Sequence, residues 1–315
     1  MSLSWINPYY LLVASFLLIN VLLGVSIYVT LSTGQLSLGN AGFMSIGAYV
    51  TAILTTRHGV PMPAGILAGT LCASATGVLV GIPALRLEGV YLAIATLGFG
   101  EVVRVLFVNW ESLTGGAVGI AAIPQMGRRI LSALRETGFS PETLGLRSNQ
   151  FISLAVFLIL LAITILVIFF FLRLESGRVG RAYGAIRMDE QAAGASGIDT
   201  TYYKVLAFTQ GAALSGFAGA LFAHVTSYIS PADFTYHRAV EILVFAVIGG
   251  SEHLLGPVFG AMFLTAIPEV LRPISDYRMV LYGIVLILVM VFRPQGWIDP
   301  PLVRRLLGWR TRETG

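Results

Sequence analysis

Long apolar runs separated by short polar segments dominate the sequence. No Asp, Glu, Lys or Arg occurs in residues 1–56 or in residues 58–85. A helix needs about 20 apolar residues to cross a bilayer, and several runs reach that length. The pattern predicts spanning helices at about residues 9–31, 35–56, 62–85, 89–108, 151–172, 204–227, 239–250, 256–271 and 279–292.

Two of these runs differ from an ordinary spanning helix. Residues 35–56 are rich in Gly, Ser and Asn, which suits a helix that packs tightly against others or is broken within the membrane. Residues 239–250 form a short run that ends in Gly249 and Gly250. We expect this run either to be tilted or to form a re-entrant pair with the segment that follows.

Composition supports a membrane protein. Hydrophobic residues make up 56% of the chain and charged residues 11%, whereas soluble domains carry roughly 25% charged residues. A large soluble protein is excluded because so little charge cannot solvate its surface. We predict an all-α, polytopic transmembrane helical bundle of about eight to ten spans, formed as a single domain over residues 1–315.

The basic residues indicate an orientation. They lie at span ends rather than in one patch, which excludes a nucleic-acid surface and fits the excess of Lys and Arg in cytoplasmic loops. If residues 173–203 are cytoplasmic, alternation places 11 basic residues inside and 8 outside. The N-terminus is then external and the C-terminus cytoplasmic, and the first span is expected to be retained.

Two long polar connections interrupt the apolar pattern. Residues 109–150 are expected outside, with an amphipathic stretch at 126–136 that either docks an external partner or caps the membrane surface. Residues 173–204 hold four arginines, one lysine and four acids, between runs that contain no charge. We interpret this second segment as a handle that a partner outside the membrane grips to move the spans.

The handle has the signals of a short helix within residues 187–198. Asp189, Glu190 and Gln191 stand near its expected start, where the helix dipole favours acids. Gly197 stands where a left-handed cap would end it. A solvated connector is the plainer alternative, but few flexible-linker features are present, so we predict a docking helix.

The sequence lacks the common motifs of enzymes. The four histidines are scattered and no HExxH or GxSxG motif occurs. A nucleotide-binding P-loop needs a lysine before Ser or Thr, and Lys204, which is the one lysine, precedes Val205. Cys72 is the single cysteine, so no disulfide framework exists. We therefore predict a transport protein that is not an enzyme and binds no cofactor itself.

Several polar residues within the predicted spans are candidates for a translocation path. An amide in hydrocarbon costs free energy unless it is hydrogen-bonded, so such residues face other helices or a wet cavity. Glu101 and Arg104 stand three apart, close enough to pair, either as a structural tie or as part of a path. Glu241 and Glu269 lie near span ends and can reach the interface. The candidate path residues are Gln35, Ser37, Asn40, Phe43 and Glu101.

Several short segments of the chain match the motifs of a known family of membrane proteins. The segment QAAGASG at 191–197 resembles the EAA-x3-G cytoplasmic loop of ABC-importer permeases, with Gln191 where Glu is frequent. The chain departs from the family pattern at residues 251–253, where a small residue is usual. Further matching segments are LSLGNAGF at 36–43, IGAY at 46–49, SGRVGRA at 176–182, AIR at 185–187, YISP at 228–231, VIGG at 247–250 and GPV at 256–258. As a set, these motifs resemble those of the permeases of branched-chain amino-acid (LIV-type) ABC importers, and the length and long outer loop of the chain are closer to their M-type subunit.

The resemblance implies a heteromeric importer in the bacterial inner membrane. Its partners would be a second, H-type permease, two ATPase subunits that use ATP and Mg²⁺, and a periplasmic solute-binding protein. The substrate would be a branched-chain amino acid, with urea or short-chain amides as the alternative. An ion-coupled secondary transporter using the acids in the spans stays open. The implied ATPase-coupling helix contains Arg187, Asp189, Glu190, Gln191, Ala192, Ala193, Gly197 and Ile198.

Overall fold

The architecture comes from a computed structural model, which describes residues 7–84, 86–136, 147–270, 283 and 287. The described part of the chain is helical and contains no β-strand, apart from an isolated antiparallel bridge between Ile120 and Ile229. The elements are α1 (Pro8–Leu31), α2 (Asn40–Arg57), α3 (Met62–Ala84), α4 (Gly89–Asn109), α5 (Glu111–Thr114), η1 (Gly116–Val118), α6 (Met126–Glu136), α7 (Ser148–Ser176), α8 (Arg178–Met188), α9 (Glu190–Ala195), α10 (Thr200–Thr226), η3 (Pro231–Phe234), α11 (Tyr236–Gly249) and α12 (Leu255–Val270).

The predicted polytopic bundle is confirmed. Five described helices, α1, α3, α4, α7 and α10, are long and apolar enough to cross a membrane. The helices α11 and α12 are shorter, with 14 and 16 residues, and they pack against each other. The span expected at 279–292 lies outside the described residues.

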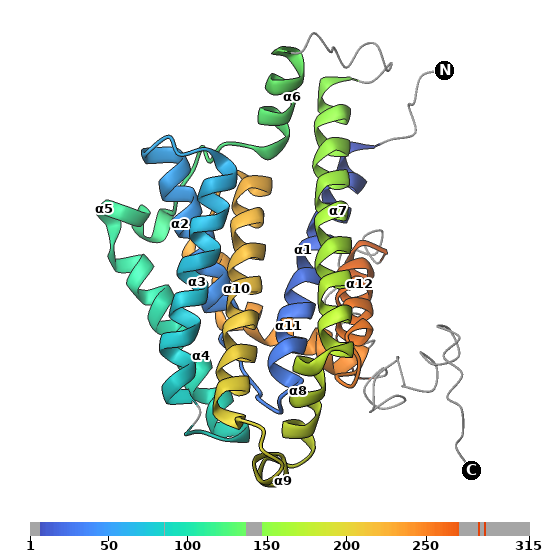
Figure 1. Ribbon diagram of the computed structural model, residues 1–315. Helices are drawn as coiled ribbons and strands as arrows, with labels where there is room; N and C mark the ends of the chain where they lie inside the picture. Colours follow the sequence, from blue (N-terminus) through green and yellow to red (C-terminus); the bar gives the residue numbers. More distant parts are fainter. Residues whose placement is uncertain (1–6, 85, 137–146, 271–282, 284–286, 288–315) are drawn as a thin grey trace, which may run out of the picture.

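The helix α1 lies at the centre of the bundle because it is apolar on every side. All residues from 18 to 30 are buried, as expected for a helix without a polar face. Its neighbours are α7, α10 and α12, and Figure 1 shows it running between them. Asn7 caps its start, since Asn7 Oδ1 accepts a hydrogen bond from the Tyr9 N–H at 3.1 Å.

The helix α2 begins inside the bundle rather than at its edge. We expected the span to start at residue 35, but residues 35–38 are not helical and α2 starts at Asn40. The non-helical backbone there is held by a side chain of another helix, since the Leu38 N–H donates to Thr96 Oγ1 of α4 at 2.8 Å. The Thr96 hydroxyl, 58 residues away, thus accepts the hydrogen bond that a backbone carbonyl would accept in a continuous helix.

Small residues bring α2, α3 and α10 into backbone contact. A Cβ added to Gly219 would lie 1.9 Å from the Met44 carbonyl oxygen, and one added to Gly47 would lie 2.0 Å from that of Gly216. Such close approach is the usual packing mode of helices in membranes, and it confirms the tight packing expected for the small-residue segments. The buried residues of α3 form a similar stripe of Met62, Gly65, Gly69, Ala73, Gly77, Gly81 and Ala84.

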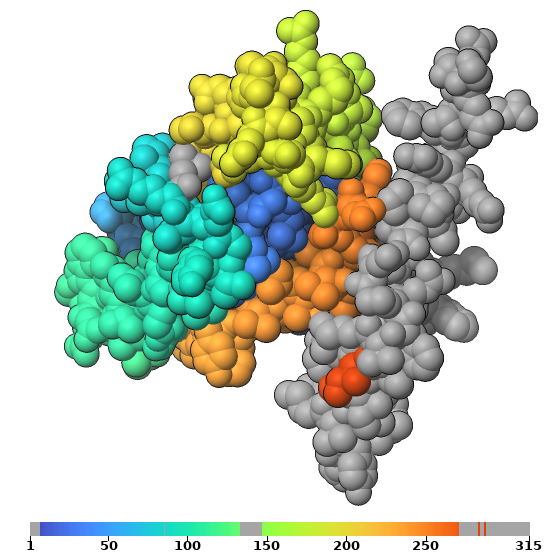
Figure 2. All heavy atoms as spheres, turned by 90° about the horizontal axis from the view of Figure 1, so that it is seen from below, coloured from blue at the N-terminus to red at the C-terminus, as the bar shows by residue number. Residues whose placement is uncertain are grey.

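The long polar connections lie at opposite ends of the bundle. Figure 1 shows α8 and α9 at one end and α6 at the other. The predicted amphipathic stretch at 126–136 is confirmed as the helix α6. Figure 2 views the α8–α9 end directly, with the blue end of α1 visible between these helices and the orange α11–α12 segment.

Candidate functional site

The handle folds into two short helices that are separated at Asp189. The extended backbone of Asp189 (φ −159°) interrupts the chain, and its Oδ1 accepts from the Ala192 N–H at 2.9 Å, which caps the start of α9. The chain leaves α9 through Gly197 in the left-handed conformation (φ +84°), which confirms the predicted cap. Two details of the expectation were wrong: Arg187 belongs to the end of α8, and Ile198 lies beyond the end of α9 at Ala195.

The outer surface of α9 is exposed. Gln191, Ala192 and Gly197 are exposed, whereas Ala193 is buried and anchors the helix to the bundle. Beside them, the Met188 side chain is 92% exposed. Small residues around an exposed apolar side chain allow a partner's backbone to approach closely, so the composition of this surface suits docking.

The helix α9 is tied to two other parts of the bundle. Glu190 forms an ion pair with Lys204 in the second turn of α10. The Arg187 guanidinium, just before α9, donates to the Ser251 carbonyl oxygen at 2.8 Å in the turn between α11 and α12. Ile198 N–H donates to the Ala193 carbonyl oxygen at 3.1 Å and closes the end of α9. The segment formed by α8 and α9 therefore contacts both α10 and the α11–α12 turn.

Tyr183 fixes α8 against α10. Its ring is buried and its hydroxyl donates to Gln210 Oε1 at 3.0 Å. Burial raises the pKa of the Tyr183 hydroxyl, with the neighbouring Tyr202 and Tyr203 acting in the same direction. The hydroxyl therefore keeps its proton and stays a hydrogen-bond donor well above neutral pH.

A buried polar cluster joins α1, α2 and α10. Asn40 Nδ2 donates to Ser26 Oγ at 2.8 Å and to Ser215 Oγ at 3.2 Å, and Ser215 Oγ donates to Ser26 Oγ at 3.0 Å. These bonds satisfy the amide that would otherwise be costly inside a bundle. The sequence indicated that Asn40 needs partners, but it could not name serines 14 and 175 residues away.

Four of the five candidate path residues are buried within this chain. Gln35 accepts from Thr33 Oγ1 at 3.2 Å, and Ser37 accepts from the Gly39 N–H at 3.3 Å. Phe43 packs against Phe99 and Phe208, with ring centroids 4.9 and 5.7 Å apart. Together with Asn40, these residues surround the start of α2. Their role in a path stays a prediction.

Glu101 lies apart from the other candidates, on the exposed side of α4. Arg104 Nε donates to both carboxylate oxygens of Glu101 at 3.0 Å, so the pairing that the spacing predicts is present. The two side chains are 43% and 29% exposed. Because a charge at a bilayer centre costs roughly 2.5–3.5 kcal/mol on insertion scales, this exposure is unusual for a spanning helix.

The other acids named as possible ion sites also have partners. Glu241 is paired with Arg238 at 2.7 Å, and Arg238 further donates to Asn20 Oδ1 at 2.6 Å. Glu269 accepts from the Tyr9 hydroxyl at 2.7 Å. The Arg238–Glu241 pair lies within α11, whereas the bonds from Arg238 to Asn20 and from Tyr9 to Glu269 join α11 and α12 to α1. In the described part of the chain, moreover, no group of three His, Cys, Asp or Glu side chains could hold a metal ion.

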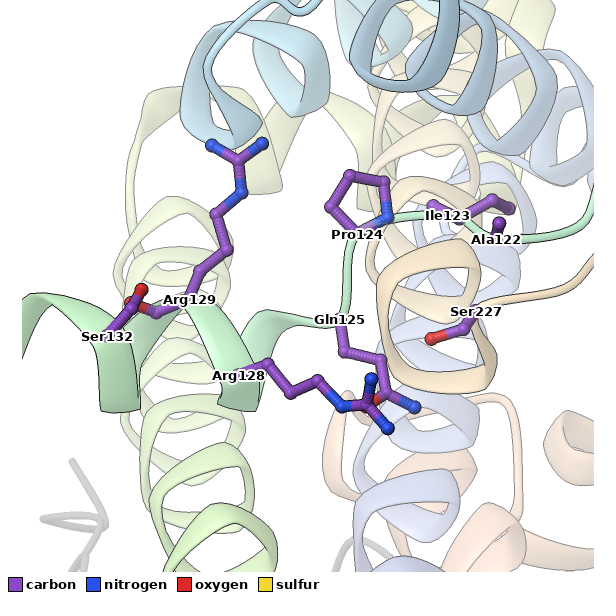
Figure 3. A pocket seen from close by; sticks show the side chains of 8 residues that line it. All are labelled: Ala122, Ile123, Pro124, Gln125, Arg128, Arg129, Ser132 and Ser227. Carbon is purple, nitrogen blue, oxygen red and sulfur yellow. The ribbon is translucent and has the colours of Figure 1, made fainter.

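An open cavity of about 670 Å³ lies beside α6 at the end opposite α9. Arg128 and Arg129 of α6 line it together with Gln125 and Ser227. Figure 3 shows Arg128 extending toward Gln125 while Arg129 extends in another direction. The sequence predicted the helix but not the cavity, because the lining also includes Ser227, which follows α10 and lies far away along the chain.

Five helices long and apolar enough to cross a membrane, with the polar helices α8 and α9 at one end, are the architecture of a multi-pass membrane protein. The chain belongs to the family described as the permease component of branched-chain amino acid transport systems, whose model matches residues 9–290. The protein is therefore a transport permease and not an enzyme.

Individual relatives agree with the family. The chain is 36% identical over 301 residues to the high-affinity branched-chain amino acid transport system permease protein LivM of Salmonella typhimurium and of Escherichia coli K12, covering 93% of this chain and 70% of each relative. It is 28% identical over 203 residues to LivH of Escherichia coli K12, covering 63% of this chain and 61% of LivH. It is also 28% identical over 253 residues to the autoinducer 2 import permease LsrC of Escherichia coli, covering 76% and 65%. No solved structure matches the chain.

Proposed function

We propose that this chain is the M-type permease subunit of an ATP-driven importer of branched-chain amino acids in the bacterial inner membrane. It would act with a second, H-type permease, two ATPase subunits and a periplasmic binding protein. The observation that carries the proposal is the exposed helix α9, which is tied by Lys204 to α10 and, through Arg187, to the α11–α12 turn. In this arrangement, a partner that displaces α9 would also displace α10 and the α11–α12 turn.

The proposed mechanism is alternating access. ATP and Mg²⁺ bind to the partner ATPases, whose closure displaces the helix α9. Because α9 is joined to α7 through α8 and to α10 through Lys204, its displacement shifts α7 against α10. A ligand biases two states only through a difference in affinity, so the docked binding protein must favour one of them.

The proposed orientation places α9 in the cytoplasm and α6 outside. Alternation of the spans then puts the N-terminus on the external side of the membrane. The C-terminal residues, which we expect in the cytoplasm, are not among the described residues. The binding protein would dock on the external surface around α6, where Arg128 and Arg129 line the open cavity. Exposed guanidinium groups there favour a partner that offers acidic side chains.

The relatives favour a branched-chain amino acid as the substrate. LivM and LivH carry this substrate class in their names, whereas LsrC is named for autoinducer 2. Related permeases therefore serve different small solutes, and specificity would reside mainly in the binding protein. Urea or short-chain amides are the alternative substrates, and an ion-coupled transporter is disfavoured because Glu101, Glu241 and Glu269 all have partners.

A substrate assay separates these possibilities. The chain is assembled in proteoliposomes with its permease and ATPase partners, and uptake of labelled leucine, urea and acetamide is measured with each candidate binding protein. We expect ATP-dependent uptake of leucine, and competition by isoleucine and valine. If urea or acetamide were carried and leucine were not, the importer would stand and the assigned substrate would be wrong.

A further inference from the structure

One face of α4 is left uncovered by the rest of the described chain. Tyr91, Ile94, Val102 and Val105 are 75%, 62%, 65% and 43% exposed. Their spacing of three, eight and three residues places them on one side of a helix. A Cβ added to Gly98, in the middle of this face, would meet no atom within 4 Å. The Glu101–Arg104 pair lies along the edge of this face.

The pair lies within the depth of the membrane. The helix α4 has 21 residues and is therefore about 31 Å long, close to the thickness of the hydrocarbon core. Glu101 stands 12 residues beyond Gly89, which is about 18 Å along the helix. The adjacent Gly100 packs against Gly42, near the start of α2, since a Cβ on Gly42 would lie 2.8 Å from Gly100 Cα.

The face itself is apolar, but lipid is a poor environment for the charged pair at its edge. An exposed carboxylate and guanidinium at membrane depth need water or protein beside them, because acyl chains offer no hydrogen bonds. The helix α7 provides a contrast. Leu166, Phe169 and Phe170 are 70%, 65% and 57% exposed, and residues 151–172 contain no charge, which is the composition of a lipid-facing surface.

The pair matches the two charges of a zwitterion. Arg104 uses Nε and Nη2 for Glu101, and within the described residues Nη1 has no hydrogen bond. A carboxylate can bind a guanidinium through two parallel hydrogen bonds, while Glu101 can accept from an ammonium group. An amino acid would thus replace each charge by an equivalent one, and no charge would be left without a partner in the membrane.

We propose that the uncovered face of α4 lines a wet path shared with the second permease, and that Glu101 and Arg104 form a transient site for the zwitterionic head of an amino acid. This inference rests on the proposed function, since it takes the substrate class and the second permease from it. Arg104 binds the substrate carboxylate and Glu101 its ammonium group. The site passes zwitterions and disfavours solutes that lack one of the charges.

Thiol labelling of the assembled complex tests the wet path. Replacing Cys72 by Ala removes the single cysteine of the chain, and Val102→Cys or Phe169→Cys then introduces one thiol at positions that are equally exposed, at 65%. A charged, membrane-impermeant methanethiosulfonate should react with V102C at least about tenfold faster than with F169C, because the bilayer core contains no water.

Protection by leucine, added without the binding protein, tests the zwitterion site. At twice its dissociation constant, leucine should slow labelling of V102C about threefold, because one third of the sites stay free. Arg104→Gln and Glu101→Gln should each remove this protection, and 4-methylpentanoate, which lacks the ammonium group, should protect less. Glu241→Gln is the matched control, since it breaks another Arg–Glu pair with the same spacing, and it should leave protection unchanged.

The outcomes are distinguishable from those of the transport assay. If the complex imports leucine but V102C reacts no faster than F169C, or leucine gives no protection, the inference is wrong and the importer stands. If no leucine is imported, the assigned substrate is wrong and the inference falls with it. Should a single variant fail to assemble, the exchange Glu101→Arg with Arg104→Glu keeps the pair, and we expect it to retain protection.

Discussion

Deletion of residues 191–197 is expected to abolish ATP-dependent uptake while the chain still inserts and assembles with the partner permease. The segment contains most of α9, whose outer surface is exposed and whose buried contact with the bundle is Ala193. Its removal therefore costs little packing, since α1 and its neighbours form the core elsewhere. The measurement is uptake of labelled substrate, together with co-purification of the two permeases.

A second variant distinguishes loss of the helix α9 from shortening of the connection between α8 and α10. Replacing residues 191–197 by seven Gly and Ser residues keeps the connection but removes the rigid helix, because such a linker behaves as a flexible coil. We expect this variant to lose uptake as well. Continued uptake in either variant, at the rate of the unmodified complex, would show that α9 does not couple the ATPases to the spans.

Gly219→Ala is expected to lower the thermal unfolding midpoint of the isolated chain in detergent. The new Cβ would lie 1.9 Å from the Met44 carbonyl oxygen, so α10 and α2 must separate, and overpacking of this kind typically costs about 1–3 kcal/mol. Gly98→Ala on α4 is the matched control, because the added Cβ meets open space.

The control is expected to move in the opposite direction. Alanine is favoured over glycine in a helix interior by about 1 kcal/mol, so Gly98→Ala should raise the midpoint slightly. An equal rise for both variants would mean that α2 and α10 do not approach closely at Gly219. The sign of the difference, rather than its size, decides the question.

The sequence predicted the features that depend on neighbouring residues. The bounds of α3 and the end of α10 follow from charge-free runs, whereas α10 begins four residues earlier than expected, at Thr200, and includes Lys204. The helix α9 follows from Asp189 at its start and Gly197 beyond its end. Helix caps and the length of a hydrophobic run depend on neighbouring residues, so both can be read directly from the sequence. The same holds for α6, whose apolar and charged positions alternate with the helical period.

The features that join distant segments could not be predicted in this way. The start of α2 at Asn40 depends on Thr96, and the link from Arg187 to Ser251 spans 64 residues. Polar groups in a membrane indicate that a partner must exist, but many serines and threonines in the chain could serve. The spacing of Glu101 and Arg104 predicted their pairing, whereas the exposure of the pair required knowledge of how α4 packs.

Uptake in reconstituted proteoliposomes tests the central claim most directly. The chain is assembled with its permease and ATPase partners, and labelled leucine is followed with ATP and the binding protein added or omitted independently. The importer mechanism predicts uptake only when both ATP and the binding protein are present. Uptake without ATP that follows an imposed ion gradient would contradict it, because the chain would then work as a secondary transporter.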